Sequence, residues 1–182
     1  IIFENKPFNL PELLDNLKKV MQYKIKEKDL NFKLDISEDV SKVLIGDKLR
    51  LNQILYNLVG NAVKFTDTGF VKVRVRNIGE TSDRVSLRFE VEDSGIGIPE
   101  DKVGAVFGTF TRIRTKARLF EGTGLGLSIA KNLVIQQNGK IGASSVLGQG
   151  STFHFELNFE KGELSQMVKS AKVEERIEVD QE

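Results

Sequence analysis

Two long segments in the first half of the chain carry apolar residues at the spacing of an α-helix. The first runs from Pro11 to about Lys28, and Asn9 stands before it as a candidate N-cap. The second spans residues 48–65, with Asp47 as its candidate N-cap. Its apolar stripe consists of Leu51, Ile54, Leu55, Leu58, Ala62 and Phe65. These stripes predict that each helix buries one side in a common core.

Alternating polar and apolar residues predict strands at residues 31–37, 70–78, 84–93, 139–146 and 151–159. Short turns at 79–83 and 147–150 join the last four of these into two hairpins. A short helix is expected after Pro99 and a third long helix at about residues 127–137. Hairpins interleaved with helices favour an α/β (α+β) fold class, a two-layer sandwich of a mixed β-sheet packed against about three helices.

The composition indicates one globular domain. Of the 182 residues, 40% are hydrophobic, which is enough for a packed core. The net charge is +1, from 27 basic and 26 acidic residues, so no global field attracts nucleic acid or a membrane surface. The chain has no cysteine, which excludes disulfides, and no apolar run approaches the roughly 20 residues of a membrane span. We assign residues 1–160 to the domain and the charge-rich residues 161–182 to a linker or tail, and the start without Met leads us to expect a piece of a longer protein.

An unusual polar stripe runs along the second predicted helix, beside its apolar side. Asn57, Asn61 and Lys64 fall together there, although solvated helix faces favour Glu and Lys over Asn. An ordinary solvated face is one interpretation. The other is a metal and phosphate site, because a neutral amide oxygen suits Mg²⁺, which takes the rest of its shell from water and phosphate oxygens.

A glycine-rich turn, DSGIGIP at residues 93–99, begins at Asp93, the last residue of a predicted strand. It fits either a plain acidic turn or a base-binding site. A carboxylate at a strand end accepts a hydrogen bond from the exocyclic amine of adenine and repels the carbonyl oxygen that guanine presents there. Gly95 and Gly97 would let the backbone approach the base closely.

A second glycine cluster, Gly122, Gly124 and Gly126, opens the third long helix. Backbone N–H groups at such a helix start bind phosphate. The spacing is not that of a Rossmann dinucleotide site, and the lysine of a Walker loop is absent. The cations just before this cluster are Arg112, Arg114, Lys116 and Arg118. Their segment shows no regular pattern and is either a lid over a triphosphate or a solvated loop.

Taken in order, these motifs resemble the N, G1, F, G2 and G3 boxes of sensor histidine kinases. The matching stretches are LNQILYNLVGNAVKFTDTG, VEDSGIGIP, VFGTFTR, EGTGLGLSIAK and GQGSTFHFEL, and the resemblance covers about residues 5–160. Such kinases belong to the GHKL ATPase superfamily, with DNA gyrase, the ninety-kilodalton heat-shock chaperone and mismatch-repair ATPases. The stretches KFTDTG and GTGLGLSIAK are most similar to the kinase branch, particularly the hybrid kinases.

The resemblance implies a Bergerat-type ATP-binding fold with ATP and Mg²⁺ as cofactors. Asn61 is the implied Mg²⁺ ligand, with Asn57 and Lys64 at the metal-bound phosphates, and these three are the implied catalytic residues. Asp93 is the implied adenine-binding residue. The other implied cofactor-binding residues are Gly95, Gly97, Ile98, Phe107, Phe110, Arg112, Gly122, Thr123, Gly124, Leu125, Gly126 and Thr152.

The resemblance also implies a protein-histidine kinase whose acceptor histidine lies on a separate domain for dimerisation and histidine phosphotransfer. A response regulator receiver domain is expected downstream. The domain itself is expected in the cytoplasm, with no nucleic acid partner and no direct membrane contact. The chain's own histidine, His154, alternates with Phe153 and Phe155 on a predicted strand. We expect it to be a surface residue and not an acceptor, so the isolated domain is not expected to autophosphorylate.

Three alternatives stay open on the sequence. The first is a clamp ATPase of the chaperone or gyrase type, in which hydrolysis is coupled to further domains. The second is a module that binds nucleotide without catalysis. The third is a Ser/Thr-directed kinase of the same superfamily, which needs a catalytic acid near Asn57; the neighbour there is Tyr56, and the polar stripe carries no carboxylate.

Overall fold

The computed structural model describes residues 2–107 and 125–167 of the chain. Its regular elements are β1 (Lys6–Asn9), α1 (Leu10–Glu27), β2 (Asn31–Ile36), β3 (Val43–Gly46), α2 (Lys48–Phe65), β4 (Phe70–Glu80), β5 (Arg84–Asp93), the 3₁₀-helix η1 (Glu100–Ala105), α3 (Leu125–Gln136), β6 (Lys140–Val146) and β7 (Gly150–Lys161). Apart from the two short strands β1 and β3, each of these elements coincides with a predicted one.

The strands described form one sheet in the order β1-β3-β7-β5-β4-β2, and β6 pairs with β7. β2 lies parallel to β4, whereas the other pairs are antiparallel. The sheet is therefore mixed, as predicted. In β5, Asp93 is paired with Val71 of β4 on one side and with Ser151 of β7 on the other. This register places Asp93, the last residue of a central strand, between two neighbouring strands.

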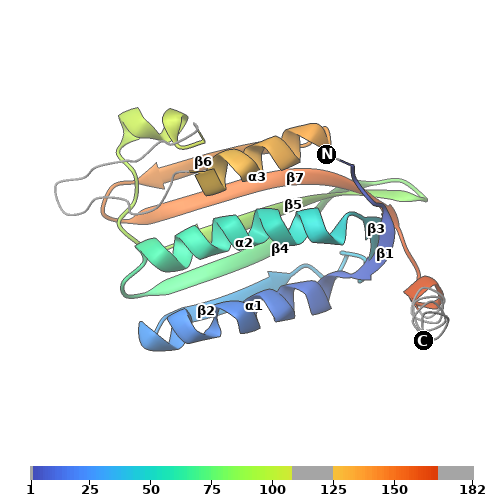
Figure 1. Ribbon diagram of the computed structural model, residues 1–182, viewed down its shortest axis with the longest axis horizontal. Helices are drawn as coiled ribbons and strands as arrows, with labels where there is room; N and C mark the ends of the chain where they lie inside the picture. Colours follow the sequence, from blue (N-terminus) through green and yellow to red (C-terminus); the bar gives the residue numbers. More distant parts are fainter. Residues whose placement is uncertain (1, 108–124, 168–182) are drawn as a thin grey trace, which may run out of the picture.

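Helices α1, α2 and α3 lie side by side over one face of the sheet (Figure 1). The strand residues that face them are apolar and buried, as a period of two requires. Phe89 of β5 and Phe155 of β7 stack beneath the helices with their ring centroids 4.7 Å apart, and both are fully buried. The predicted two-layer sandwich is confirmed, and burial of this apolar interface is its main source of stability.

Side chains fix the ends of the helices that carry the site. Asn9 and Asp47 cap α1 and α2, each accepting a backbone N–H three residues ahead at 3.0 Å, so both predicted N-caps are present. At the other end of α2, Lys28 Nζ donates to the carbonyl oxygens of Val63 and Lys64, each at 2.8 Å. The C-terminal turn of α2 is thereby held against α1.

The two strands absent from the sequence prediction, β1 and β3, pair with each other at one edge of the sheet. Residues of β3 are largely buried on both faces, so no alternation marks this strand in the sequence. β1 has only 4 residues. β7 continues to Lys161, which pairs with Leu44. The sheet thus extends one residue into the segment that we assigned to the tail.

One position of the predicted apolar stripe of α2 differs in the structure. Phe65 is partly exposed and lines a pocket, whereas Val59 and Val63 complete the buried side of this helix. The helical wheel places Phe65 at the boundary of the apolar side, where a pocket and a core look alike in sequence.

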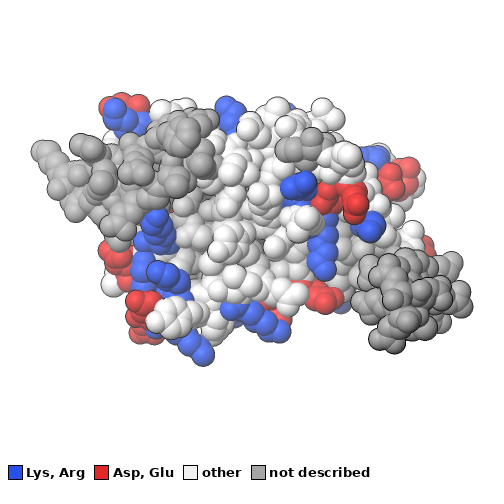
Figure 2. Space-filling model, viewed as in Figure 1, with Lys and Arg blue, Asp and Glu red and all other residues white. Residues whose placement is uncertain are grey.

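The centre of this face, over the helical layer, is uncharged, and the charged side chains lie along its margins and towards its two ends (Figure 2). Basic and acidic groups are mixed at both ends, in agreement with a net charge near zero. No helix in residues 2–107 or 125–167 is long and apolar enough to cross a membrane.

Candidate functional site

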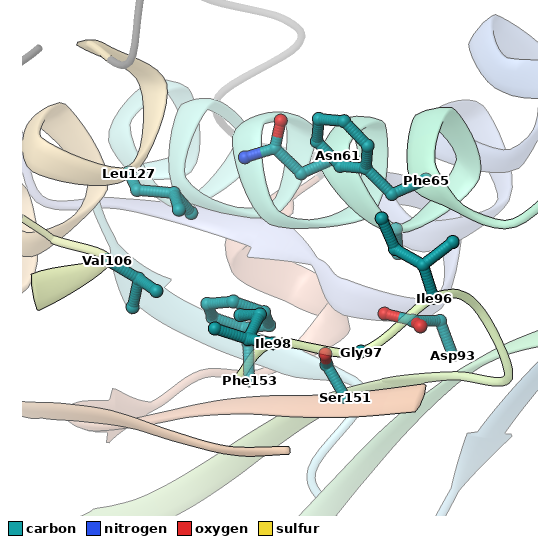
Figure 3. A pocket seen from close by; sticks show the side chains of 11 residues that line it. Asn61, Phe65, Asp93, Ile96, Gly97, Ile98, Val106, Leu127, Ser151 and Phe153 are labelled. Atoms are coloured by element: carbon teal, nitrogen blue, oxygen red, sulfur yellow. The ribbon is translucent and has the colours of Figure 1, made fainter. Parts of the chain in front are cut away.

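A pocket with about 530 Å³ of empty space, including the solvent at its open mouth, lies between α2, the loop after β5, the start of α3 and the β6–β7 hairpin. Figure 3 shows Asp93 at one end of the pocket and Leu127 at the other, beneath Phe65 and Asn61 of α2. The described lining residues are Asn61, Ala62, Phe65, Asp93, Ile96, Gly97, Ile98, Val106, Leu127, Ser151 and Phe153. The pocket thus collects segments that lie far apart in the sequence.

Asp93 supplies the one carboxyl group among these lining residues and is only 8% exposed. Burial raises its pKa to about 6, because loss of water disfavours the charged form. Backbone N–H groups of Gly95, at 2.9 Å, and of Ser151 donate to the carboxyl and oppose this shift. At neutral pH the group is ionised and largely desolvated, so it accepts strongly from a donor that enters the pocket.

The loop after β5 is held against the β6–β7 hairpin by close contacts. Gly97 has φ +69°, and a Cβ at this position would lie 2.2 Å from the carbonyl oxygen of Val146. Ser145 Oγ accepts the backbone N–H of Ile98 at 2.7 Å and lies 2.7 Å from Ser151 Oγ. The main role of glycine at position 97 is therefore to allow close contact between the backbone of the loop and the backbone of the hairpin. This contact fixes the pocket wall that carries Ile98.

The polar stripe of α2 borders the pocket and the start of α3. Asn61 is a lining residue (Figure 3). Asn57 reaches further along the helix, where its Nδ2 donates to the carbonyl oxygen of Gly126 at 3.1 Å. Lys64 Nζ lies 5.4 Å from the centroid of the Phe65 ring, within cation–π range. All three polar side chains are partly buried, which is unlike an ordinary solvated helix face.

The remaining predicted site residues are only partly within the described ranges. Gly95 and Ile98 lie in the loop beside Asp93, and Gly126 lies in the first turn of α3. Phe107 packs edge-on against Phe153, with ring centroids 5.9 Å apart, behind the pocket wall. The predictions for Phe110, Arg112, Gly122, Thr123, Gly124 and the side chain of Leu125 fall outside the described part of the chain.

Thr152 is not among the described residues that line the pocket, so its predicted role in cofactor binding stays a prediction. Successive residues of β7 face opposite sides of the sheet, and it is Ser151 and Phe153 that face the pocket. The alternation of phenylalanines with His154 carries this information, and His154 lies on the outer face as predicted. Sequence reasoning also missed Ile96, Val106 and Leu127, whose apolar side chains carry no chemical mark of a site.

The chemistry of these groups limits what the site can hold. Apolar walls with one desolvated carboxylate at the end suit a flat heterocycle that carries an amino group. Within the described ranges, no three His, Cys, Asp or Glu side chains cluster as metal ligands. A metal ion here would rest on an amide oxygen such as that of Asn61, together with oxygens of a bound ligand, which is the shared coordination that Mg²⁺ adopts with phosphates.

The sequence profile described as "Histidine kinase-, DNA gyrase B-, and HSP90-like ATPase" matches residues 46–161. The sensory/regulatory protein RpfC of Xanthomonas campestris pv. campestris is 41% identical over 165 residues, which are 90% of this chain and 23% of RpfC. The signal transduction histidine-protein kinase BarA of Escherichia coli K12 is 38% identical over 161 residues, which are 88% of this chain and 18% of BarA. The chain thus spans about a fifth of the length of these curated relatives.

Solved structures with the same fold include two that match this chain at 30% sequence identity or more. Full-length ShkA in complex with AMPPNP superposes with a TM-score of 0.76 at 32% sequence identity, over 89% of this chain and 32% of ShkA. The nucleotide-free catalytic domain of the histidine kinase ThkA superposes with a TM-score of 0.66 at 30% identity, over 87% of this chain and 96% of that domain.

Proposed function

The chain belongs to the histidine kinase-, DNA gyrase B- and HSP90-like ATPase family, as the ATP-binding catalytic domain of a sensor histidine kinase, and on this premise we propose that it transfers the γ-phosphoryl group of ATP to a histidine on a separate domain. One observation carries the proposal: a buried carboxyl group, that of Asp93, closes one end of an apolar pocket that Asn61 borders. Relatives that are named histidine kinases favour this function over a clamp ATPase.

Asp93 would bind the exocyclic amine of adenine. Its carboxyl is ionised at neutral pH, it is shielded from water, and the walls beside it are the flat backbone of the loop at Gly97 and the side chain of Ile98. A guanine in the same place would direct a carbonyl oxygen at this carboxylate. The site therefore favours ATP over GTP.

Asn61, Asn57 and Lys64 would hold the phosphate end of the nucleotide. Asn61 offers an amide oxygen as a Mg²⁺ ligand, and Asn57 already links α2 to the first turn of α3 through Gly126. When bound, Mg²⁺ would neutralise charge on the phosphate oxygens. The predicted phosphate contacts of Arg112, Gly122, Thr123, Gly124 and Leu125, and that of Phe110 at the lid, remain predictions.

The chemical step breaks the bond between the γ-phosphorus and the bridging oxygen of ADP and forms a phosphorus–nitrogen bond to the acceptor imidazole. The catalytic domain has little covalent chemistry to perform, so its part is positioning and charge stabilisation. Asp93 holds the base, and Lys64 supplies positive charge near the phosphates. We assign the group that accepts the imidazole proton to the acceptor domain.

The partners are inferred from the reaction, which needs an acceptor histidine on another domain, and from the relatives, of whose length this chain spans about a fifth. We infer that a dimerisation and histidine phosphotransfer domain of the same protein supplies the acceptor, and that a response regulator receiver domain takes the phosphoryl group from it. This exchange would take place in the cytoplasm. We propose that residues 1–160 form the catalytic unit and that residues 161–182 link it to a further module.

The test incubates the domain with Mg²⁺ and γ-labelled ATP, alone and with its cognate phosphotransfer domain. We expect label on the acceptor histidine in the mixture and none on His154 in either reaction. Asn61→Ala should lower the rate of transfer by about 10–100-fold, whereas Asn52→Ala, on the opposite side of α2, should leave it within about twofold. Label on His154, or full activity of Asn61→Ala, would contradict the proposal.

A further inference from the structure

Thr66 carries a hydroxyl group whose hydrogen bonding the fold leaves incomplete. Its side chain is fully buried, and its Oγ1 is the one buried side-chain polar atom among the described residues without a hydrogen bond of normal geometry. Buried polar groups in folded proteins are nearly always hydrogen-bonded, so an exception calls for an explanation, such as a bound water or ion or a functional role.

This hydroxyl lies directly beside the adenine-binding carboxyl. A Cβ built on Gly95 would be 2.8 Å from Thr66 Oγ1 and 3.0 Å from Asp93 Oδ1, so both oxygens border the same small space. The hydroxyl is near enough to help lower the pKa of Asp93, although burial outweighs it. The backbone of Thr66 is fixed, because its carbonyl oxygen accepts from Lys28 Nζ at 3.3 Å.

We propose that Thr66 is a positioning residue for adenine: in the nucleotide complex its hydroxyl donates a hydrogen bond to the Asp93 carboxylate and holds it in the orientation that receives the exocyclic amine. A carboxylate offers about four acceptor positions. The N–H groups of Gly95 and Ser151 occupy two of them, so the Thr66 hydroxyl and the adenine amine complete the set. This inference rests on the proposed function, since it presumes that adenine binds at Asp93.

The groups next to Asp93 are mostly uncharged, which suits a neutral hydrogen-bond donor such as the Thr66 hydroxyl. Glu92, on the same strand, raises the pKa of Asp93. The paired residues Val71 and Ser151 on the neighbouring strands are uncharged, and so is the loop 94–99. At the end of α2, Lys64 lies beside the ring of Phe65, which lines the pocket, while Lys28 pairs with Asp67 at 3.6 Å and donates to the carbonyl oxygen of Thr66. A hydroxyl donor stabilises the carboxylate here without adding a charge that adenine would meet.

The experiment compares Thr66→Val, which keeps the shape and removes the donor, with Thr66→Ser, which keeps the donor. Calorimetric titration with ATP across pH 5–8 gives the affinity and the pH midpoint below which binding weakens. We expect Thr66→Val to bind about tenfold more weakly at pH 7.5 and to shift the midpoint upward, and Thr66→Ser to match the wild type within about twofold in both. Equal binding by Thr66→Val, or an equal loss in both variants with an unshifted midpoint, would overturn the inference.

A second measurement needs no variant. In the wild-type domain saturated with Mg²⁺ and ATP, the hydroxyl proton of Thr66 should exchange slowly enough to be seen by NMR, because it is buried and hydrogen-bonded. Rapid exchange with solvent would contradict the inference. If the wild type fails to bind ATP at all, the proposed function falls, whereas ATP binding that is insensitive to Thr66 removes only the positioning role.

Discussion

Asp93 combines two properties that oppose each other. It accepts a hydrogen bond from adenine most strongly when it is ionised, yet it is only 8% exposed, and burial raises its pKa to about 6. The N–H groups of Gly95 and Ser151 keep the pKa from rising further. The carboxyl is therefore ionised at neutral pH and lies close to losing its charge, so the site should respond to modest acidification.

We expect the affinity for ATP to fall as the pH is lowered through about 6, approaching tenfold per pH unit below that value. The stability of the nucleotide-free domain should change in the opposite sense. Folding raises the pKa of Asp93 from 3.8 to about 6, so the protonated carboxyl favours the folded state, and this contribution is lost as the pH rises through that interval. Calorimetric titration and urea unfolding between pH 4 and 8 measure both effects.

Asp93→Asn is the reference for this pH dependence, because it removes the titrating group while ATP still titrates its own phosphate. The ratio of wild-type to variant affinity should fall with acidification. A ratio that is constant down to pH 5 would show that Asp93 does not control binding.

Ser151 and Thr152 offer a matched pair on one strand. Ser151→Ala removes a hydroxyl that lines the pocket and lies 2.7 Å from Ser145 Oγ, so ATP binding should weaken by about 3–10-fold. Thr152→Ala changes the outer face of the sheet and should leave binding within about twofold. A larger loss for Thr152→Ala would instead support the predicted role of Thr152 in cofactor binding.

This pair also shows which residues of the site the sequence can reveal. Asp93, Gly97 and Asn61 carry chemistry or conformational freedom that an ordinary loop or helix does not need, so they were predicted. The choice between Ser151 and Thr152 depends on which side of β7 faces the helices. The alternation of Phe153 and Phe155 with His154 already places Ser151 on the core side of β7, whereas its position opposite Asp93 follows from the strand register, which is a property of the assembled sheet.

The loop after β5 rests on the β6–β7 hairpin. Gly148 N donates to the carbonyl oxygen of Ile96 at 2.7 Å, and Gly97 passes the hairpin at a distance that no side chain permits. The shape of the adenine wall therefore depends on the turn at residues 147–150, about fifty residues further along the chain. Backbone contact between the two elements couples the base site to the sheet edge.

Gly97→Ala should break this coupling. A Cβ there would lie 2.2 Å from a backbone oxygen, at a φ of +69° that side chains rarely adopt, so we expect a loss of about 1–3 kcal/mol in stability and at least about tenfold in ATP affinity. Gly104→Ala is the control, because a Cβ in η1 meets nothing within 4 Å. Urea unfolding and ATP titration of both variants provide the comparison. Equal behaviour of the two would contradict the close contact at Gly97.

Elements were predictable to the extent that their residues face two different environments. α2 lies between a polar stripe and the core, and its capped start at Lys48 and its end at Phe65 agree with the prediction. β3 is largely buried on both faces and lacks alternation, so its sequence could not distinguish it from the approach to α2. Its partner β1 is too short for a pattern and exists through pairing with β3.

For the whole molecule, the pocket is the place where distant parts of the chain meet. α2, the loop after β5, the start of α3 and the end of β7 each supply part of its lining. A ligand that fills this space contacts all of them at once. Because those contacts exist only in the folded state, ATP should stabilise the entire domain and not the loop alone.

We expect thermal unfolding to report this linkage directly. At an ATP concentration of about 100 times Kd, binding adds about 2.7 kcal/mol to the free energy of unfolding, which raises Tm by roughly 5–10 °C for a domain of this size. Removal of Mg²⁺ with a chelator should reduce the rise, because phosphate charge near Asn61 and Lys64 would no longer be neutralised. GTP should give little rise, since its carbonyl oxygen faces the Asp93 carboxylate, and Asp93→Asn should narrow the difference between the two nucleotides. An equal rise with GTP and ATP in the wild type would show that the base is bound elsewhere, because no other carboxyl lines the described part of this pocket.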